Sequence, residues 1–179
     1  MRKMIASALT LCAALGLPIV VTQAASAKNF SCVTYAPDST GPDSCAGGFS
    51  TGSIWFSGGG VGLERQEIWT WGNGSNPPDS TATWTINGLV AHEGYKVEVY
   101  IPNAHSDAPS AHYSMFDGAG VFQGNGFVNQ ESVTNNWAVV GFACSNGTIR
   151  VRVDDSGTPV ADQIGADALK VDETGNTCS

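Results

Sequence analysis

The feature that most constrains this chain is a two-residue alternation of apolar and polar side chains in short segments. Residues 81–86 alternate threonines with Ala, Trp and Ile, and residues 95–101 and 149–153 follow the same rule. Successive side chains of a β-strand point to opposite faces, so each segment predicts a strand with one buried face. No stretch sustains the period of about 3.6 residues that an amphipathic helix needs. The pattern therefore predicts an all-β fold with little helix.

Turn residues divide these segments at short intervals. Pro102 follows one predicted strand, residues 117–118 (Asp-Gly) a second, and residues 154–157 a third. Proline cannot donate to a sheet ladder, and Asp, Ser and Gly favour turns. Residues 137–142 are apolar on both faces, which predicts a central strand, and residues 163–171 supply a last strand. Many short strands separated by turns predict an antiparallel β-sandwich.

The composition narrows the classes of protein further. Of 179 residues only 13% are charged and 22 are glycines, which excludes the Glu-, Lys- and Leu-rich coiled coils and helical bundles. The net charge of −8 argues against nucleic acids and against a polybasic membrane contact, because both need a basic surface. A hydrophobic share of 42% is enough for a packed core and argues against disorder.

The N-terminus carries the three parts of a secretory signal peptide. Residues 2–3 supply its positive charge, residues 4–21 its uncharged apolar stretch, and residues 25–27 (Ala-Ser-Ala) its cleavage site. We therefore expect residues 1–27 to be removed and the mature chain to begin near Lys28. The protein is predicted to be secreted, to stay extracellular or at the cell wall, and to have no membrane attachment after cleavage.

Loss of the signal peptide changes the charge and the cysteine count. The net charge falls from −8 to −10, because residues 1–27 hold two basic residues and no acid. Four of the five cysteines remain, and an even number in a secreted chain predicts two disulfides with three possible pairings. We favour Cys32–Cys45, which would staple a short loop rich in Pro, Gly and Asp. We pair Cys144 with Cys178, which would tie the C-terminal tail to a strand.

These features divide the chain into four parts. They are the signal peptide (1–27), a loop-like N-terminal segment stapled by a disulfide (28–48), the β-sandwich domain (49–171) and a C-terminal tail (172–179). The second boundary marks the change from turn residues to alternating strands. No internal repeat or long linker points to a second domain.

The sequence offers no recognisable catalytic or metal-binding constellation. It holds three histidines, His92, His105 and His112, and it lacks the G-x-S-x-G nucleophile motif. The acidic residues are scattered, and many flank Gly, Pro or Ser as turn residues do. Residues 105–107 (His-Ser-Asp) lack the spacing of a zinc site, and residues 154–157 lack that of an EF-hand loop. We therefore predict a protein that is not an enzyme and needs no cofactor or metal.

Five segments share an order and spacing with one family of domains. They are residues 82–86 (A-T-W-T-I), 94–113 (G-Y-K-V-E-V-Y-I-P-N-A-H-S-D-A-P-S-A-H-Y), 136–141 (N-W-A-V-V-G), 149–155 (I-R-V-R-V-D-D) and 165–171 (G-A-D-A-L-K-V). Over residues 49–171 the chain resembles the golvesin C-terminal-like domain, also described as the xanthan-lyase carbohydrate-binding-like domain. The pattern is similar to that of the versions found in secreted actinobacterial hydrolases.

The resemblance implies both a fold and a role. The implied fold is a jelly-roll, galactose-binding-like β-sandwich, and the implied role is to hold a peptidase, lyase or other hydrolase on polysaccharide or cell wall. No catalytic domain accompanies the domain here. We therefore expect a free-standing module that binds for itself or acts with a separate secreted hydrolase.

Aromatic side chains are the first candidates for sugar binding, because a ring face covers the apolar side of a pyranose. Trp69 and Trp71 lie two residues apart on one face of a predicted strand. Two interpretations stay open for them, a stacking pair for sugar and core packing. Trp84 and Trp137 are predicted core residues. Tyr100 points opposite to the buried side chains of its strand, so it is predicted to be exposed.

The loop of residues 103–110 is the polar part of the candidate site. Asn103, His105 and Asp107 offer donors and acceptors for sugar hydroxyls. The alternative is that the Asn and Asp side chains bond the backbone of their own loop, as in Asx turns. Asp167 lies between two inward-facing alanines and is predicted to anchor a neighbouring loop rather than to contact ligand.

Three hypotheses for function follow. The first is a secreted, non-catalytic module that binds polysaccharide or cell-wall glycan, and the second is a secreted surface or interaction β-sandwich with a protein partner. The third is a small hydrolase or lyase, or an accessory factor to one, which needs convergent acids or a His–carboxylate pair in a cleft. Burial of both Trp69 and Trp71 would remove the main support for the first. The excess of acid makes a strongly anionic polymer the least expected ligand unless a cation bridges the two.

Overall fold

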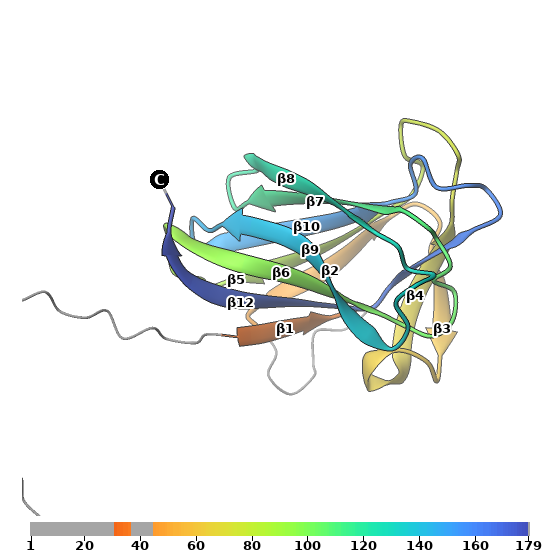
Figure 1. Cartoon of the computed structure of the whole chain (residues 1–179), viewed down its shortest axis with the longest axis horizontal. Helices are drawn as coiled ribbons and strands as arrows, with labels where there is room; N and C mark the ends of the chain where they lie inside the picture. Colours follow the sequence, from red (N-terminus) through yellow and green to blue (C-terminus); the bar gives the residue numbers. More distant parts are fainter. Residues whose placement is uncertain (1–30, 37–44, 179) are drawn as a thin grey trace, which may run out of the picture.

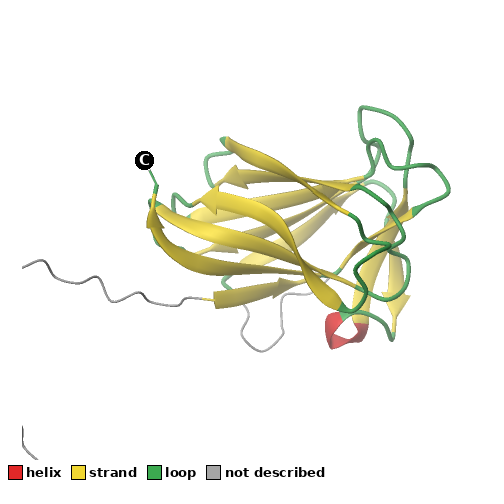
Figure 2. Ribbon diagram, in the orientation of Figure 1, coloured by secondary structure: helices red, strands yellow, loops and turns green. Residues whose placement is uncertain are grey.

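The computed structural model describes residues 31–36 and 45–178, and the structural statements below concern these ranges. The predicted signal peptide and residues 37–44 of the stapled segment lie outside them. Within the ranges the regular elements are β-strands and a short 3-10 helix, drawn in red in Figure 2, joined by loops and turns. No helix in this part of the chain is long and apolar enough to cross a membrane. The prediction of an all-β fold is confirmed.

The strands form three sheets, and every pairing is antiparallel. The four-stranded sheet has the order β1 (Ser31–Tyr35), β12 (Ala168–Thr177), β6 (Glu93–Ile101) and β9 (Asn136–Cys144). The five-stranded sheet has the order β2 (Gly47–Gly52), β5 (Thr81–Asn87), β10 (Thr148–Asp154), β7 (Ala111–Asp117) and β8 (Phe122–Val128). The three-stranded sheet has the order β11 (Gln163–Ala166), β4 (Gln66–Trp71) and β3 (Phe56–Gly59), and the 3-10 helix η1 (Leu63–Arg65) precedes β4.

The two larger sheets pack face to face, and the three-stranded sheet lies at one end of this sandwich (Figure 1). Trp84, Val151 and Met115 form one row across β5, β10 and β7, and each is at most 2% exposed. From the other sheet Tyr95 and Val97 reach the same core and are fully buried. Burial of each such side chain contributes about 1.5–3 kcal/mol. The alternation seen in the sequence is therefore the alternation between core and solvent.

Two stretches differ from their predicted structure at the N- and C-terminal boundaries. The strand β1 lies in the segment predicted as loop, because Cys32 pairs with Val171 of β12 and turns its side chain to the core. The strand predicted over residues 163–171 is broken at Asp167, so that β11 and β12 belong to different sheets. The second of them continues to Thr177, into the predicted tail.

The strand β9 was expected at the centre of a sheet, and it lies at an edge. Val139 and Phe142 on its outer face are 52% and 65% exposed. Trp137, predicted as core, is half-buried on the same outer face, with Tyr100 at 5.5 Å and the ammonium of Lys170 at 4.8 Å from its ring centroid. An apolar outer face can thus belong to an edge strand when a few long side chains partly cover it.

The two predicted disulfides are confirmed. Cys32 of β1 is bonded to Cys45 just before β2, 13 residues along the chain. Cys144 at the end of β9 is bonded to Cys178, which follows β12, at a separation of 34 residues. In the chain-entropy account such cross-links stabilise the fold by restricting the unfolded chain, by about 3–4 kcal/mol each.

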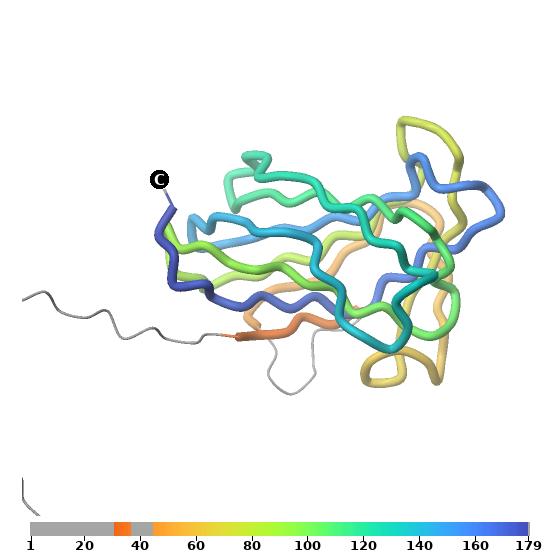
Figure 3. Tube along the Cα trace, in the orientation of Figure 1, coloured from red at the N-terminus to blue at the C-terminus, as the bar shows by residue number. Residues whose placement is uncertain are grey.

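The loops gather at the end of the sandwich that holds the three-stranded sheet. Residues 72–80 and 155–162 lie side by side there, at the right of Figure 3. The backbone N–H of Gly74 donates to the carbonyl of Thr158 at 2.8 Å, which joins the two loops. The opposite end holds the C-terminus and the Cys144–Cys178 bond. This asymmetry places the candidate site at the loop-rich end.

Candidate functional site

Four rings form one cluster at the loop-rich end, here called the aromatic cluster. Trp69 of β4 stacks on Phe56 of β3, at 4.6 Å between ring centroids, and on His105 of the loop 103–110, at 4.7 Å. Trp71 meets Trp69 edge-on at 5.4 Å. Phe56 is the cross-strand partner of Trp69, and the two tryptophans share a face because they are two residues apart. Three of the predicted site residues, Trp69, Trp71 and His105, are therefore in contact.

The two tryptophans differ in what they offer to a ligand. Phe56 approaches Trp69 from the β3 side of β4, and His105 approaches from the β11 side. There Gly165 lies opposite Trp69 and packs against the backbone of His105. Both faces of Trp69 are thus covered, and only its edges are left for other contacts. Trp71 and Phe56 are 43% and 41% exposed. These two rings, rather than the pair of tryptophans, form the accessible aromatic surface.

The exposed rings of Phe56 and Trp71 line a surface pocket of about 410 Å³. Ile54 and Val160, both 67% exposed, extend its apolar wall. Its polar lining consists of Thr70, Asn73, Asp79, Ser80 and Asp155. The pocket therefore combines open ring faces with hydroxyl, amide and carboxyl groups.

Some polar groups of this pocket are hydrogen-bonded within the protein, and others are open to solvent. The buried carboxylate of Asp155 accepts hydrogen bonds from the backbone N–H groups of Asp79 and Ser80, at 2.9 and 3.0 Å. The hydroxyl of Thr70 donates to the carbonyl of Ile54 at 2.7 Å. The side chain of Asp79 is exposed and has no hydrogen bond or ion pair within the described ranges. Asp79 is therefore the carboxylate that remains free at the pocket.

His105 is held by an acid beneath the aromatic cluster. The Nδ1 atom of His105 lies 2.6 Å from Oε1 of Glu67, whose side chain is fully buried. Burial raises the pKa of the Glu67 carboxyl, and the hydrogen bond and charge of His105 oppose the rise. A Cβ at Gly58, opposite Glu67 on β3, would lie only 2.5 Å from the same oxygen, so glycine leaves the room that the carboxyl fills.

Asp167 lies close to this pair at the junction of β11 and β12. Its Oδ2 atom accepts a 2.6 Å hydrogen bond from the N–H of Leu63, so it anchors the η1 segment as the sequence predicts. Burial raises the pKa of Asp167 to about 8; the bond from Leu63 opposes the rise, and the charge of Glu67 adds to it. In the described ranges no group of three or more His, Cys, Asp or Glu side chains is placed to hold a metal ion.

The polar loop contributes unequally to the site. Asn103 is exposed, and its side chain makes no hydrogen bond to any residue that the structure describes. Asp107 instead accepts a hydrogen bond from the N–H of Gln163 in β11, so its carboxylate fastens the loop to the three-stranded sheet. His105 has a φ of 52°, a left-handed conformation that is uncommon outside glycine. The loop is thus bent so that the imidazole lies on Trp69.

Tyr100 lies apart from the aromatic cluster. It is half-buried on the outer face of the four-stranded sheet, where its ring meets Trp137 edge-on at 5.5 Å. Burial raises its pKa, and the charge of Asp167 adds to the rise. The structure therefore does not bring the predicted Tyr100 to the pocket of Phe56 and Trp71.

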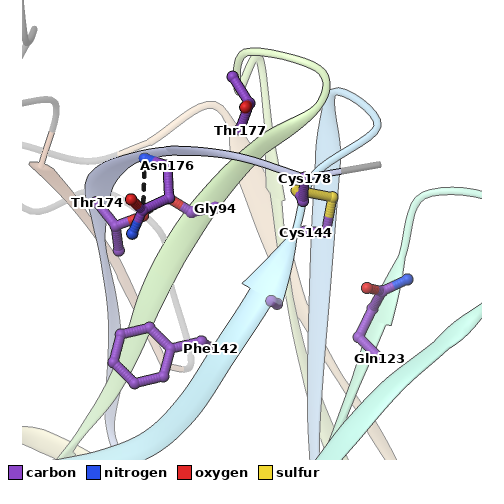
Figure 4. A pocket seen from close by; sticks show the side chains of 9 residues that line it. Gly94, Gln123, Phe142, Cys144, Thr174, Asn176, Thr177 and Cys178 are labelled. Carbon is purple, nitrogen blue, oxygen red and sulfur yellow. Dashed lines mark hydrogen bonds between the residues drawn. A yellow bond between two sulfur atoms is a disulfide. The ribbon is translucent and has the colours of Figure 1, made fainter.

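A second pocket, of about 330 Å³, lies at the opposite end of the molecule beside the Cys144–Cys178 disulfide (Figure 4). Phe142 and Gln123 face it, and Thr174 closes one side with its hydroxyl bonded to the carbonyl of Gly94 at 2.8 Å. It contains one exposed ring and none of the predicted binding residues. The pocket of Phe56 and Trp71 is therefore the stronger candidate for a sugar.

Sequence reasoning missed Phe56 and Glu67. Period-two spacing places Glu67, Trp69 and Trp71 on one face of β4, which was a usable signal for Glu67. Phe56 stands in a Gly- and Ser-rich stretch, and only the pairing of β3 with β4 brings it to Trp69. A hairpin between those two strands, if it had been recognised, would have predicted the Phe56–Trp69 pair.

No family model matches the chain, and no curated protein matches it. Solved structures do share its fold. A xanthan lyase from Paenibacillus superposes with a TM-score of 0.62 at 16% identity, over 82% of this chain and 13% of the lyase. The CBM36-1 domain of a xylanase from the hindgut metagenome of Trinervitermes trinervoides gives 0.50 at 11% identity, over 82% of this chain and the whole domain.

The C-terminal CBM6 of a marine laminarinase from Zobellia galactanivorans gives a TM-score of 0.49 at 13% identity, over 80% of this chain and 99% of the module. This chain spans only about an eighth of the xanthan lyase, so that enzyme's activity belongs to a much longer protein. At these identities the likeness concerns the fold. The fold is an antiparallel β-sandwich of the kind that carbohydrate-binding modules have.

Proposed function

We propose that this protein is a non-catalytic module that binds a polysaccharide at the pocket of Phe56 and Trp71. The observation that carries the proposal is the pair of exposed rings at a pocket with hydroxyl, amide and carboxyl groups. Sugar recognition needs this combination, because a pyranose has an apolar face and a rim of hydroxyls. The fold of the xanthan lyase and xylanase modules supports it as an analogy.

Each residue has a distinct role in this proposal. Trp71 and Phe56 supply the platform on which a sugar ring lies. Asp79 and Asn73 in the pocket lining supply donors and acceptors, with the predicted Asn103 and His105 on the adjoining loop, while Trp69 holds the rings in place. The Glu67–His105 pair fixes the orientation of the imidazole. Among the described residues no nucleophile is hydrogen-bonded to that pair, so we assign it a positioning role and not a catalytic one.

We further propose that the protein acts outside the cell. Two disulfides are typical of oxidising compartments, and the A-x-A site predicts a mature chain that starts at Lys28. In this proposal the target is cell-wall glycan, and the functional partner is a secreted hydrolase. The golvesin-like motif order of residues 49–171 supports the same assignment.

Retention on insoluble polymers tests the proposal. The purified protein is mixed with cellulose, xylan, β-glucan, chitin and purified peptidoglycan, and the bound fraction is measured. We expect retention on at least one polymer and a loss of about tenfold in affinity for Trp71→Ala, since one stacked ring contributes about 1.5 kcal/mol.

Phe142→Ala is the control, because Phe142 is an exposed ring on the four-stranded sheet, at 65% against 43% for Trp71. Its retention should equal that of the wild type. Absence of retention on every polymer would refute the proposal, and equal losses for the two variants would refute the assigned pocket.

A further inference from the structure

The outer face of the five-stranded sheet is a separate surface that the proposed function does not use. Its strands β7, β8 and β10 run along the upper side of Figure 1. Three rows cross these strands on the side away from the core, and all but Ser114 and Asp154, which are 3% and 1% exposed, have side chains open to solvent. The rows are Phe127–His112–Asp154, Asn125–Ser114–Arg152 and Phe122–Phe116–Arg150. We call these nine residues the arginine face.

Aromatic rings stand at both ends of the arginine face. Phe127, 66% exposed, stacks on His112 at 5.1 Å between centroids. Phe122, 55% exposed, meets Phe116 edge-on at 5.8 Å. His112 and Phe116 are four positions apart on β7, which separates the two ring pairs by about 13 Å along an extended strand. The rings therefore offer two contact points along an open path rather than one enclosed pocket.

The two arginines of this face keep donors free. The guanidinium of Arg152 lies over the ring of Phe116, with its carbon 5.6 Å from the centroid. Its Nη2 atom forms an ion pair with Oδ2 of Asp154 at 3.7 Å, and its Nε atom is buried without a hydrogen-bond partner among the described residues. Arg150 donates one bond, at 3.0 Å, to the carbonyl of Gly118. A guanidinium has five N–H donors. Arg150 therefore keeps donors for a ligand, and Arg152 can offer those of its two terminal nitrogens, because its Nε is buried.

Positive charge exceeds accessible negative charge on this face. Asp154 is its one acid and is buried, and the ring nitrogen of His112 and the hydroxyl of Ser156 already occupy its carboxylate. The rows continue onto β5 and β2 with uncharged side chains of Thr, Ser and Gly. On the four-stranded sheet Lys96 and Lys170 are both paired with Glu98. On the arginine face Arg152 is paired with Asp154, and Arg150 has no acid partner among the described residues. A net charge of −8 for the whole chain thus hides a local cationic patch.

We infer that the arginine face binds an acidic glycan, with uronate carboxylates on Arg150 and Arg152 and sugar rings on the exposed phenylalanines. A planar guanidinium matches a carboxylate with two parallel hydrogen bonds, and open aromatic faces take pyranose rings. At one end of the arginine face Phe127 and His112 line a pocket of about 250 Å³. The rest of its lining is formed by Asn76, Ser156 and Gly157. This inference goes beyond the proposed function and stands without it.

A pair of ligands that differ only in charge tests the inference. The probes are an oligogalacturonate and the same oligosaccharide with every carboxylate methyl-esterified. Isothermal titration should show about tenfold tighter binding of the acid form, because only that form has the charge-assisted bonds to the two arginines. Raising the salt from about 0.05 M to about 0.5 M should weaken the acid form and leave the ester unchanged.

Variants locate the binding surface. Arg150→Gln and Arg152→Gln should each remove most of the preference for the acid form, whereas Arg65→Gln, the same change at an exposed arginine elsewhere, should preserve it. Phe122→Ala should weaken both probes, and Phe142→Ala should weaken neither. Shifts of backbone NMR signals in the wild-type protein should map to β7, β8 and β10, a result that needs no variant to fold.

The outcomes separate this inference from the proposed function. Trp71→Ala should leave oligouronate binding unchanged, because Trp71 lies in the three-stranded sheet. Absence of binding for the acid form, or binding that Arg150→Gln and Arg152→Gln both leave intact, would overturn the inference. Tighter binding of a single-stranded oligonucleotide would also overturn it, since nucleic acids likewise present anions and flat rings.

Discussion

Asp167→Asn is expected to remove a pH dependence of stability that a buried carboxyl creates. In the unfolded chain the pKa of this carboxyl is near its ordinary value of 3.8, and in the folded protein burial raises it to about 8. Between these values the folded state holds one proton more than the unfolded state. The free energy of unfolding therefore falls as the pH rises through this window.

The size of the effect follows from the same numbers. One proton corresponds to a slope of about 1.4 kcal/mol per pH unit, so the wild type loses on the order of 4 kcal/mol from pH 5 to pH 8 through Asp167 alone. Asparagine keeps an oxygen that accepts the N–H of Leu63, and it does not ionise. The variant therefore lacks this loss.

Urea unfolding of both proteins across this pH range, with disulfides intact, measures the effect. The difference between the two free energies isolates Asp167, because the other acids are common to both chains. We expect Asp167→Asn to gain about 4 kcal/mol relative to the wild type between pH 5 and pH 8. A difference that stays constant with pH would refute the account of this site.

Asp172→Asn is a control with the opposite sign. Burial by itself would raise the pKa of the Asp172 carboxyl. Hydrogen bonds from Ser31 and Lys96 outweigh burial and hold the pKa below its ordinary value. Because the pKa is lower in the folded protein than in the unfolded chain, the ionised carboxyl stabilises the fold at pH values above the unfolded pKa. This stabilisation is lost as the pH falls through the folded pKa. The Asp172→Asn variant should therefore lose stability relative to the wild type at neutral pH and recover it in acid.

Three further changes test other parts of the structure. Replacing both Cys144 and Cys178 by Ser opens a 34-residue loop and should lower the free energy of unfolding by about 3–4 kcal/mol, measured by urea unfolding without reductant. Gly62→Ala should cost about 1–3 kcal/mol more than Gly60→Ala, because both glycines have a positive φ but only a Cβ at Gly62 meets Asp167, at 2.4 Å; equal thermal denaturation midpoints would contradict this. Glu67→Ala leaves His105 without its 2.6 Å partner and should cost about 2–4 kcal/mol, while Glu67→Gln, which keeps an acceptor, should cost less than half of that.

Local alternation made much of the sandwich predictable. The strands β5, β6 and β10 were found because each buries every second residue, as Trp84 and Val97 do. The disulfide pairings were predicted because a Pro- and Gly-rich loop and the C-terminal tail each need a cross-link to hold them in place. These features depend on residues that are near one another in the sequence.

The parts that were missed depend on distant residues. Phe56 joins Trp69 only because β3 pairs with β4, and the faces of Trp69 are covered only because the loop of His105 folds over Gly165. The cationic patch was hidden because the net charge sums the whole chain, whereas Arg150 and Arg152 share one face of β10 with a single acid, Asp154. The net charge describes the whole chain, whereas ligand binding depends on the charges of the one face that the ligand contacts.

The indole N–H signal of Trp71 in a soluble oligosaccharide titration tests the central claim most directly. The oligosaccharide is cut from a polymer that retains the protein, and ¹⁵N NMR follows the tryptophan side chains. The account predicts that the Trp71 signal shifts in step with binding, while that of Trp84, which is 1% exposed, stays in place. Saturated binding with an unmoved Trp71 signal would contradict the account.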